Sequence, residues 1–71
     1  MPYFCVNKMA QSGTGDHEVH DLGTDKNCLP RHENRFDLGF HATCREAVRE
    51  AKKYYSDTNG CYYCANDCHT T

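Results

Sequence analysis

Three of the six cysteines in this chain lie within eight positions near its end, in the segment Cys61–Cys68. Cys61 and Cys64 have the Cys-x-x-Cys spacing, at which two thiolates on one tight turn can bind the same metal ion. A structural zinc site needs four thiolate or imidazole ligands in a tetrahedron, so two more must come from upstream. We predict that these are His20, at the end of an expected strand, and Cys28, in the loop that follows. The predicted metal ligands, with zinc as the expected ion, are therefore His20, Cys28, Cys61 and Cys64.

Other thiols and imidazoles leave alternatives open. Cys68 and His69 follow the predicted pair, and either could replace Cys61 in the ligand set. They could equally belong to a frayed end of the chain, and we favour the set that contains Cys61. The remaining candidates are expected to have no ligand role, two as small buried hydrophobes and two as surface imidazoles: Cys5, Cys44, His17 and His32.

The small size of the chain gives a reason for such a site. The sequence has 71 residues, which is enough for a single domain. A chain this short buries only about 60% of the surface that its unfolded state exposes. Apolar residues make up 38% of it, whereas about 45–50% is usual. Such a core leaves little net stability, so we expect a metal ion, a disulfide or a partner to supplement it.

The start of the chain helps to choose between a metal ion and disulfides, because it indicates the compartment of the protein. Met1–Lys8 lacks the charged region and long apolar run of a signal peptide, and no segment approaches 18 apolar residues. We therefore expect a cytoplasmic protein that does not contact a membrane. In a reducing compartment, cysteines serve more often as metal ligands than as disulfides. Disulfides and free buried thiols remain the alternatives.

The elements that would position the ligands follow from local patterns. Aromatic, β-branched and alternating residues predict strands at about 3–7, 17–22 and 35–39, with Phe36 and Leu38 facing the core. A helix is predicted over 43–55. The expected fold class is α+β: a β-hairpin or three-stranded antiparallel sheet packed on one amphipathic helix, with a Cys/His-rich C-terminal turn.

The predicted helix has two distinct faces. Thr43 and Glu46 have the spacing of a capping box, in which the hydroxyl and the carboxylate satisfy backbone N–H groups at the helix start. Apolar residues gather on one side, and a basic stripe runs along the other. This stripe could contact a protein or a nucleic acid, or it could be a solvated face with intrahelical ion pairs. Its residues are Arg45, Arg49, Lys52 and Lys53.

Several short motifs follow one another in the order found in a known zinc module. They are an upstream His and Cys, an Asn-containing strand, a Thr-x-x-Glu-Ala helix start and a Cys-x-x-Cys pair. In chain order, the residues that carry these motifs are His20, Cys28, Glu33-Asn34-Arg35, Leu38-Gly39, Thr43, Glu46-Ala47, Cys61 and Cys64. In this order they resemble the metal-binding module in the N-terminal part of the Ada DNA-alkylation repair protein. The resemblance covers about residues 17–64 and implies a zinc site at the Cys-x-x-Cys pair. The chain is also similar to small uncharacterised bacterial cysteine-rich proteins.

The chain departs from the Ada pattern before its second ligand pair. That family usually has a Gly-Tyr-x-Pro-Cys approach, whereas here the helix is expected to continue through Tyr55 and a turn at Ser56–Gly60 intervenes. One zinc-bound cysteine of the Ada protein is also a methyl acceptor. We do not carry that role over, because it depends on the electrostatics and substrate fit of that site.

These observations favour a metal-stabilised binding module that is not an enzyme and contacts a protein or nucleic-acid partner. The net charge of −2 argues mildly against a general nucleic-acid binder. The alternative function is thiol, redox or metal-handling chemistry at Cys61-x-x-Cys64. Hydrolysis at a metal with an open position is disfavoured, because a chain this short leaves little room for a pocket.

Overall fold

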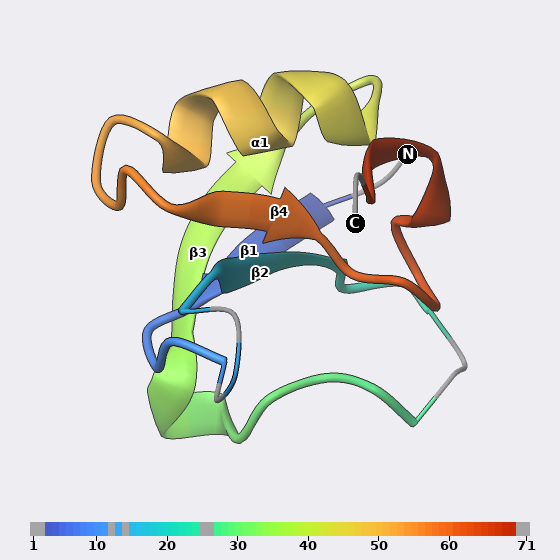
Figure 1. Ribbon diagram of the computed structural model, residues 1–71. Helices are drawn as coiled ribbons and strands as arrows, with labels where there is room; N and C mark the ends of the chain where they lie inside the picture. The colour runs from blue at the N-terminus through green and yellow to red at the C-terminus, as the bar shows by residue number, and fades with distance from the viewer. Residues whose placement is uncertain (1–2, 12, 14, 25–26, 70–71) are drawn as a thin grey trace.

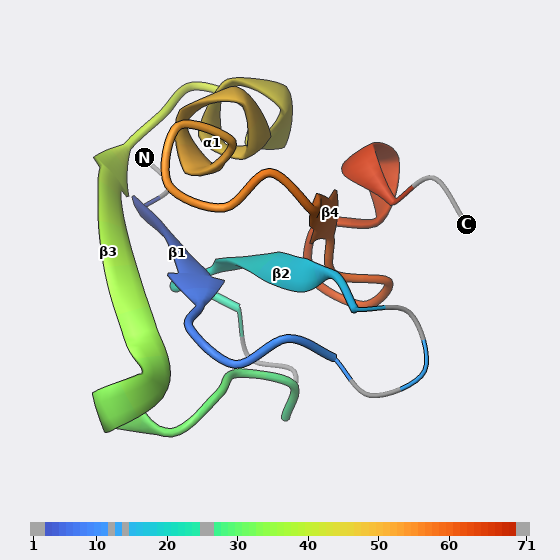
Figure 2. The same cartoon turned by 60° about the vertical axis from the view of Figure 1, so that its left-hand side comes forward.

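A computed structural model describes residues 3–11, 13, 15–24 and 27–69. One helix packs against one face of a four-stranded sheet whose strand order is β3-β1-β2-β4 (Figures 1 and 2). The elements in chain order are β1 (Tyr3–Asn7), β2 (His17–Asp21), the 3₁₀ turn η1 (His32–Asn34), β3 (Arg35–Phe40), the helix α1 (Cys44–Ala51), β4 (Thr58–Gly60) and the 3₁₀ turn η2 (Asn66–Cys68).

The predicted α+β class is confirmed, and the three predicted strands are present. The sheet is larger than expected, however, because Thr58–Gly60 forms a fourth strand where the sequence indicates only a turn. β1 pairs antiparallel with both β2 and β3, while β4 pairs parallel with β2. The sheet is therefore mixed, and α1 connects β3 to β4 across the two strands that lie between them.

The two faces of the sheet are covered differently. On the helix side, the buried side chains of Phe4, Val6 and Val19 pack with Ala47 and Ala51 of α1. Small alanines let the helix lie close to the strands. The prediction that Phe36 and Leu38 face this core is confirmed, since both pack against it while partly buried. Residues 27–34, which lead into β3, pass beneath the opposite face of the sheet (Figures 1 and 2).

Helix α1 begins as expected but ends earlier than predicted. The Thr43 hydroxyl accepts a hydrogen bond from the backbone N–H of Glu46 at 3.3 Å, as an N-cap does. The helix then ends at Ala51 rather than at residue 55. Beyond it, the N–H groups of Lys53 and Tyr54 bond three residues back, at 3.1 and 2.9 Å, which tightens the chain into a turn. This turn brings the Tyr55 ring over His17, with 4.1 Å between the ring centroids.

Candidate metal centre

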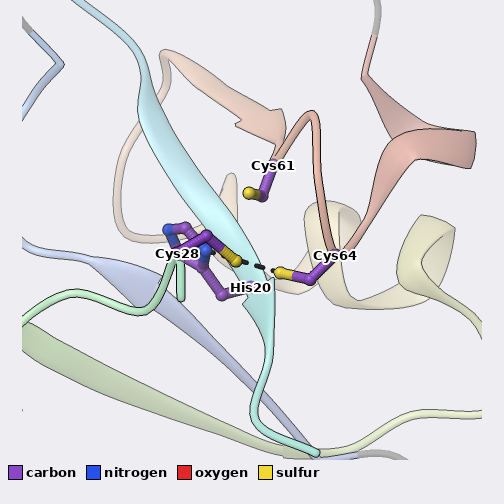
Figure 3. A group of neighbouring side chains, drawn as sticks. All are labelled: His20, Cys28, Cys61 and Cys64. Atoms are coloured by element: carbon purple, nitrogen blue, oxygen red, sulfur yellow. Dashed lines mark hydrogen bonds between the residues drawn. The ribbon is translucent and has the colours of Figure 1, made fainter. Parts of the chain in front are cut away.

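The four side chains predicted as metal ligands lie together on the sheet face opposite α1 (Figure 3). Their donor atoms, three sulfurs and one imidazole nitrogen, are all within 4.8 Å of one another. His20 and Cys61 are buried, each only 2% exposed, whereas Cys28 and Cys64 are half-buried. The cluster could hold a metal ion, and it draws its donors from three separate segments of the chain.

The pairing of β2 with β4 brings two of these donors together. Val19 pairs with Gly60 in the parallel register, and the Cys61 N–H donates to the Val19 carbonyl at 2.9 Å. Continuing the register by one residue sets Cys61 beside His20. The adjacent residues Val19 and His20 point to opposite faces of the sheet, as successive strand residues do. The apolar side chain thus enters the core while the imidazole faces the cluster.

The segment after β4 forms the tight turn that Cys-x-x-Cys spacing predicts. The Ala65 N–H donates to the Cys61 carbonyl at 3.0 Å and closes the turn. Backbone N–H groups also point at the sulfurs. Tyr63 donates to Cys61 Sγ at 3.4 Å, and Asp21 donates to Cys64 Sγ at 3.3 Å. Such N–H groups stabilise thiolate charge, so this turn is already arranged for two anionic sulfurs.

Cys28 comes from the loop between β2 and β3, which Arg35 attaches to the sheet. The Arg35 guanidinium Nε donates to the Pro30 carbonyl at 2.9 Å, two residues after Cys28. Arg35 is also close enough for its positive charge to add to the burial that lowers the pKa of His20, and to offset part of the burial that raises the pKa of Cys5. It therefore holds the loop in place and contributes positive charge beside a group of thiols. The sequence carries no local signal for this role of Arg35, because the hydrogen bond depends on how the loop folds back.

Burial determines the protonation of the cluster. It lowers the pKa of His20 to about 4, with a further contribution from Arg35, so the imidazole is neutral at neutral pH and has a lone pair for a metal. Burial likewise raises the pKa of the Cys28 and Cys64 thiols. A cation among them would reverse this preference, because metal binding displaces the thiol protons.

One separation between donor atoms matches that of a tetrahedral zinc site. With zinc bonds of about 2.3 Å to sulfur and about 2.0 Å to nitrogen, neighbouring donors in a tetrahedron are separated by about 3.5–3.8 Å. His20 Nδ1 lies 3.5 Å from Cys64 Sγ, close to that separation. The other ring nitrogen, Nε2, faces the Glu18 carboxylate at 3.8 Å. A carboxylate on that side of a ligating imidazole is a common means of orienting the ring.

The alternative ligands lie elsewhere. Cys68 forms a disulfide with Cys44, which links η2 to the first turn of α1 with 6.2 Å between the Cα atoms. Cys44 is thus not simply a buried hydrophobe as predicted. The 24-residue separation of the two cysteines carries no local signal for this pairing. His69 Nδ1 lies 2.9 Å from the Gly60 carbonyl rather than in the cluster.

The remaining predicted positions are also placed by the structure. Cys5 is fully buried with a free thiol, as expected. His32 is exposed, but His17 is half-buried, and its Nδ1 lies 2.9 Å from the Asn7 carbonyl. The basic stripe is exposed on the outer side of α1 and the turn after it: Arg45, Arg49, Lys52 and Lys53. Residues 70 and 71 lie outside the described residues.

No family model matches this chain, and comparison with curated proteins and solved structures finds no significant match. The resemblance to the Ada module therefore stays a prediction. Within the described residues, no helix is both long enough and apolar enough to cross a membrane.

Proposed function

We propose that this chain is a small binding module whose fold is stabilised by one structural zinc ion held by His20, Cys28, Cys61 and Cys64. The observation that carries the proposal is the convergence of three thiols and a neutral imidazole within 4.8 Å, from segments far apart in the sequence. Three soft sulfur donors and one imidazole favour zinc over the oxygen-preferring ions magnesium and calcium.

The number of protein donors favours a structural role over a catalytic one. Catalytic zinc sites usually have three protein ligands and keep the fourth position open for water or substrate. Here four side chains of the protein are available, so a tetrahedral ion would be fully enclosed. The same geometry disfavours Cys61-x-x-Cys64 as a thioredoxin-like dithiol, since the pair follows β4 and does not open an α-helix.

An ion at this position would stabilise the side of the sheet that lacks a helix. Among the described residues, the buried apolar side chains larger than cysteine are Phe4, Val6 and Val19, and all three lie on the helix side. The opposite face has a cluster of donors in place of an apolar core. Zinc there would join β2, the Cys28 loop and the C-terminal turn with a binding free energy of about 10–16 kcal/mol, as in small zinc domains.

Metal analysis of protein purified without added metal tests this proposal. We expect one equivalent of zinc, three thiols protected from alkylation by the ion, and loss of structure on treatment with a strong chelator. His20→Asn should abolish stoichiometric zinc, whereas His32→Asn, which changes an exposed imidazole outside the cluster, should retain it. A compact metal-free species that survives the chelator unchanged in a native mass spectrum would refute the proposal.

The partner of the module is proposed to be acidic, either a protein or a nucleic acid, and to meet the exposed basic stripe of α1. Arg45, Arg49 and Lys52 have no ion pair within the described part of the chain, whereas Lys53 pairs with Glu50 at 3.4 Å. Binding to labelled DNA or RNA at two salt concentrations separates the two partner classes. Phosphate contacts require an affinity that falls as salt rises. If nucleic acid does not bind at either concentration, an acidic protein is the remaining partner class.

A further inference from the structure

The disulfide between Cys44 and Cys68 lies outside the metal cluster and borders two surface hollows. Both cysteines are half-buried rather than buried, and both line a surface hollow of about 710 Å³ between the start of α1 and the C-terminal turn. A second hollow, of about 340 Å³, is lined by Cys68 but not by Cys44. A molecule in the second hollow therefore lies against Cys68 and not against Cys44.

We propose that this disulfide undergoes thiol–disulfide exchange with a small acidic thiol of the glutathione type, which binds in the second hollow and attacks Cys68 Sγ. The cations Arg45, Arg49 and Lys52 line this hollow, together with Val48 and a single carboxylate, that of Asp67. These three cations have no ion pair within the described residues. They suit a ligand that carries carboxylates and reacts as a thiolate.

The two sulfurs are not equivalent as leaving groups. Cys44 is the first residue of α1, after the N-cap Thr43, and Arg45 follows it. A helix N-terminus and a neighbouring arginine both stabilise a thiolate. Cys68 instead follows Asp67, whose charge opposes a thiolate there, while the cations of the second hollow favour one. The bond breaks with Cys44 as the leaving group because the thiolate in the second hollow attacks Cys68, and the helix N-terminus stabilises the Cys44 thiolate that leaves.

The exchange is balanced in two steps. The incoming thiolate forms a bond to Cys68 Sγ while the Cys44–Cys68 bond breaks, and Cys44 Sγ keeps the electron pair and takes a proton from water. A second thiolate then attacks the bound small-molecule sulfur and releases Cys68 as a thiolate, which is protonated in turn. The protein disulfide is reduced by two electrons, and two small thiols are oxidised to their own disulfide.

The test compares glutathione with its diethyl ester, which has the same thiol but no free carboxylates. The zinc-loaded full chain is reduced by each, samples are quenched with acid and alkylated, and opening of the disulfide is followed by peptide mass spectrometry. At low salt we expect glutathione to react at least about threefold faster than the ester, from its charge attraction to the cations. The mixed disulfide should map to Cys68.

Variants on the outer side of α1 provide the control. Arg49→Gln together with Lys52→Gln should bring the ratio of the two rates close to one. Lys53→Gln removes a cation that pairs with Glu50 and does not line the hollow, so it should leave the ratio unchanged. A wild-type ratio of one, an adduct on Cys44, or a disulfide that opens only when the protein unfolds would overturn the proposal. Zinc content measured in the same samples reports on the metal site separately, so either proposal can fail without the other.

Discussion

Of the five glycines, Gly60 is the one where the structure leaves least room for a side chain. A Cβ added there would lie 2.7 Å from both the Ala65 carbonyl oxygen and Cys68 Cβ, and 2.8 Å from the Cys68 carbonyl carbon. Ordinary contact begins at 3.4 Å, so the C-terminal turn must retreat by about 3.4 − 2.7 = 0.7 Å. The obstructing atoms belong to backbone and to a disulfide-bonded cysteine, so no flexible side chain can move aside. We expect Gly60→Ala to lower the free energy of unfolding by about 2–3 kcal/mol, the upper part of the range for overpacking.

The size of this effect can be measured by urea denaturation of the zinc-loaded protein followed by circular dichroism. For a domain of this size, each kcal/mol corresponds to about 4–8 °C in Tm, so a drop of roughly 8–24 °C should accompany it. Because Gly60 directly precedes Cys61, the displaced turn should also weaken zinc binding. Affinity measured by competition with a chromophoric chelator reports this second effect.

Gly23→Ala is the matched control. Its added Cβ meets only the Asp21 Oδ1 atom, at 3.4 Å, and the backbone there does not have the positive φ that favours glycine. The substitution should therefore change the free energy of unfolding by no more than about 1 kcal/mol. Alanine also lowers the conformational entropy of the unfolded chain, which favours the folded state. Equal stability of the two alanine variants would show that the C-terminal turn is not packed on β4 as described.

Three further perturbations test separate parts of the structure. Arg35→Ala removes the hydrogen bond to the Pro30 carbonyl and should weaken zinc binding about tenfold or more in a chelator competition. Arg31→Ala changes a side chain that is 81% exposed, and it should leave the zinc affinity unchanged. Thr43→Ala should cost about 1 kcal/mol of unfolding free energy in urea, because the N-cap bond to Glu46 is lost. Burial raises the pKa of Cys5 from 9.0 to about 11, so the folded state disfavours its thiolate. The stabilisation that comes from this raised pKa is complete below pH 9 and is lost as the pH rises through 11. Over this range, the free energy of unfolding of wild type should fall by up to about 2.7 kcal/mol more than that of Cys5→Ala.

Much of the candidate site could be predicted from the sequence. Cys-x-x-Cys is a local pattern that a single turn satisfies, and the alternation around Val19 and His20 already separates a core side chain from one on the other face. The start of α1 was predictable for the same reason, since the Thr43 hydroxyl reaches a backbone group only three residues away. Each of these features depends on residues that are neighbours in the chain.

Long-range contacts decided the rest. Thr58–Gly60 has the composition of a turn and becomes a strand only because β2 offers a parallel partner. Likewise, α1 ends at Ala51 as the chain turns to place Tyr55 on His17, a contact across 38 positions.

Composition and short spacings along the chain predict the fold class, the helix start and the types of donor available for a metal. The position of Cys61 beside His20, and the pairing of Cys68 with Cys44 instead of its joining the cluster, depend on how distant segments pack together. The physical reason is that thiols of equal chemistry differ only in where the backbone holds them. That placement follows from the parallel pairing of β2 with β4 and from the packing of the C-terminal turn over Gly60.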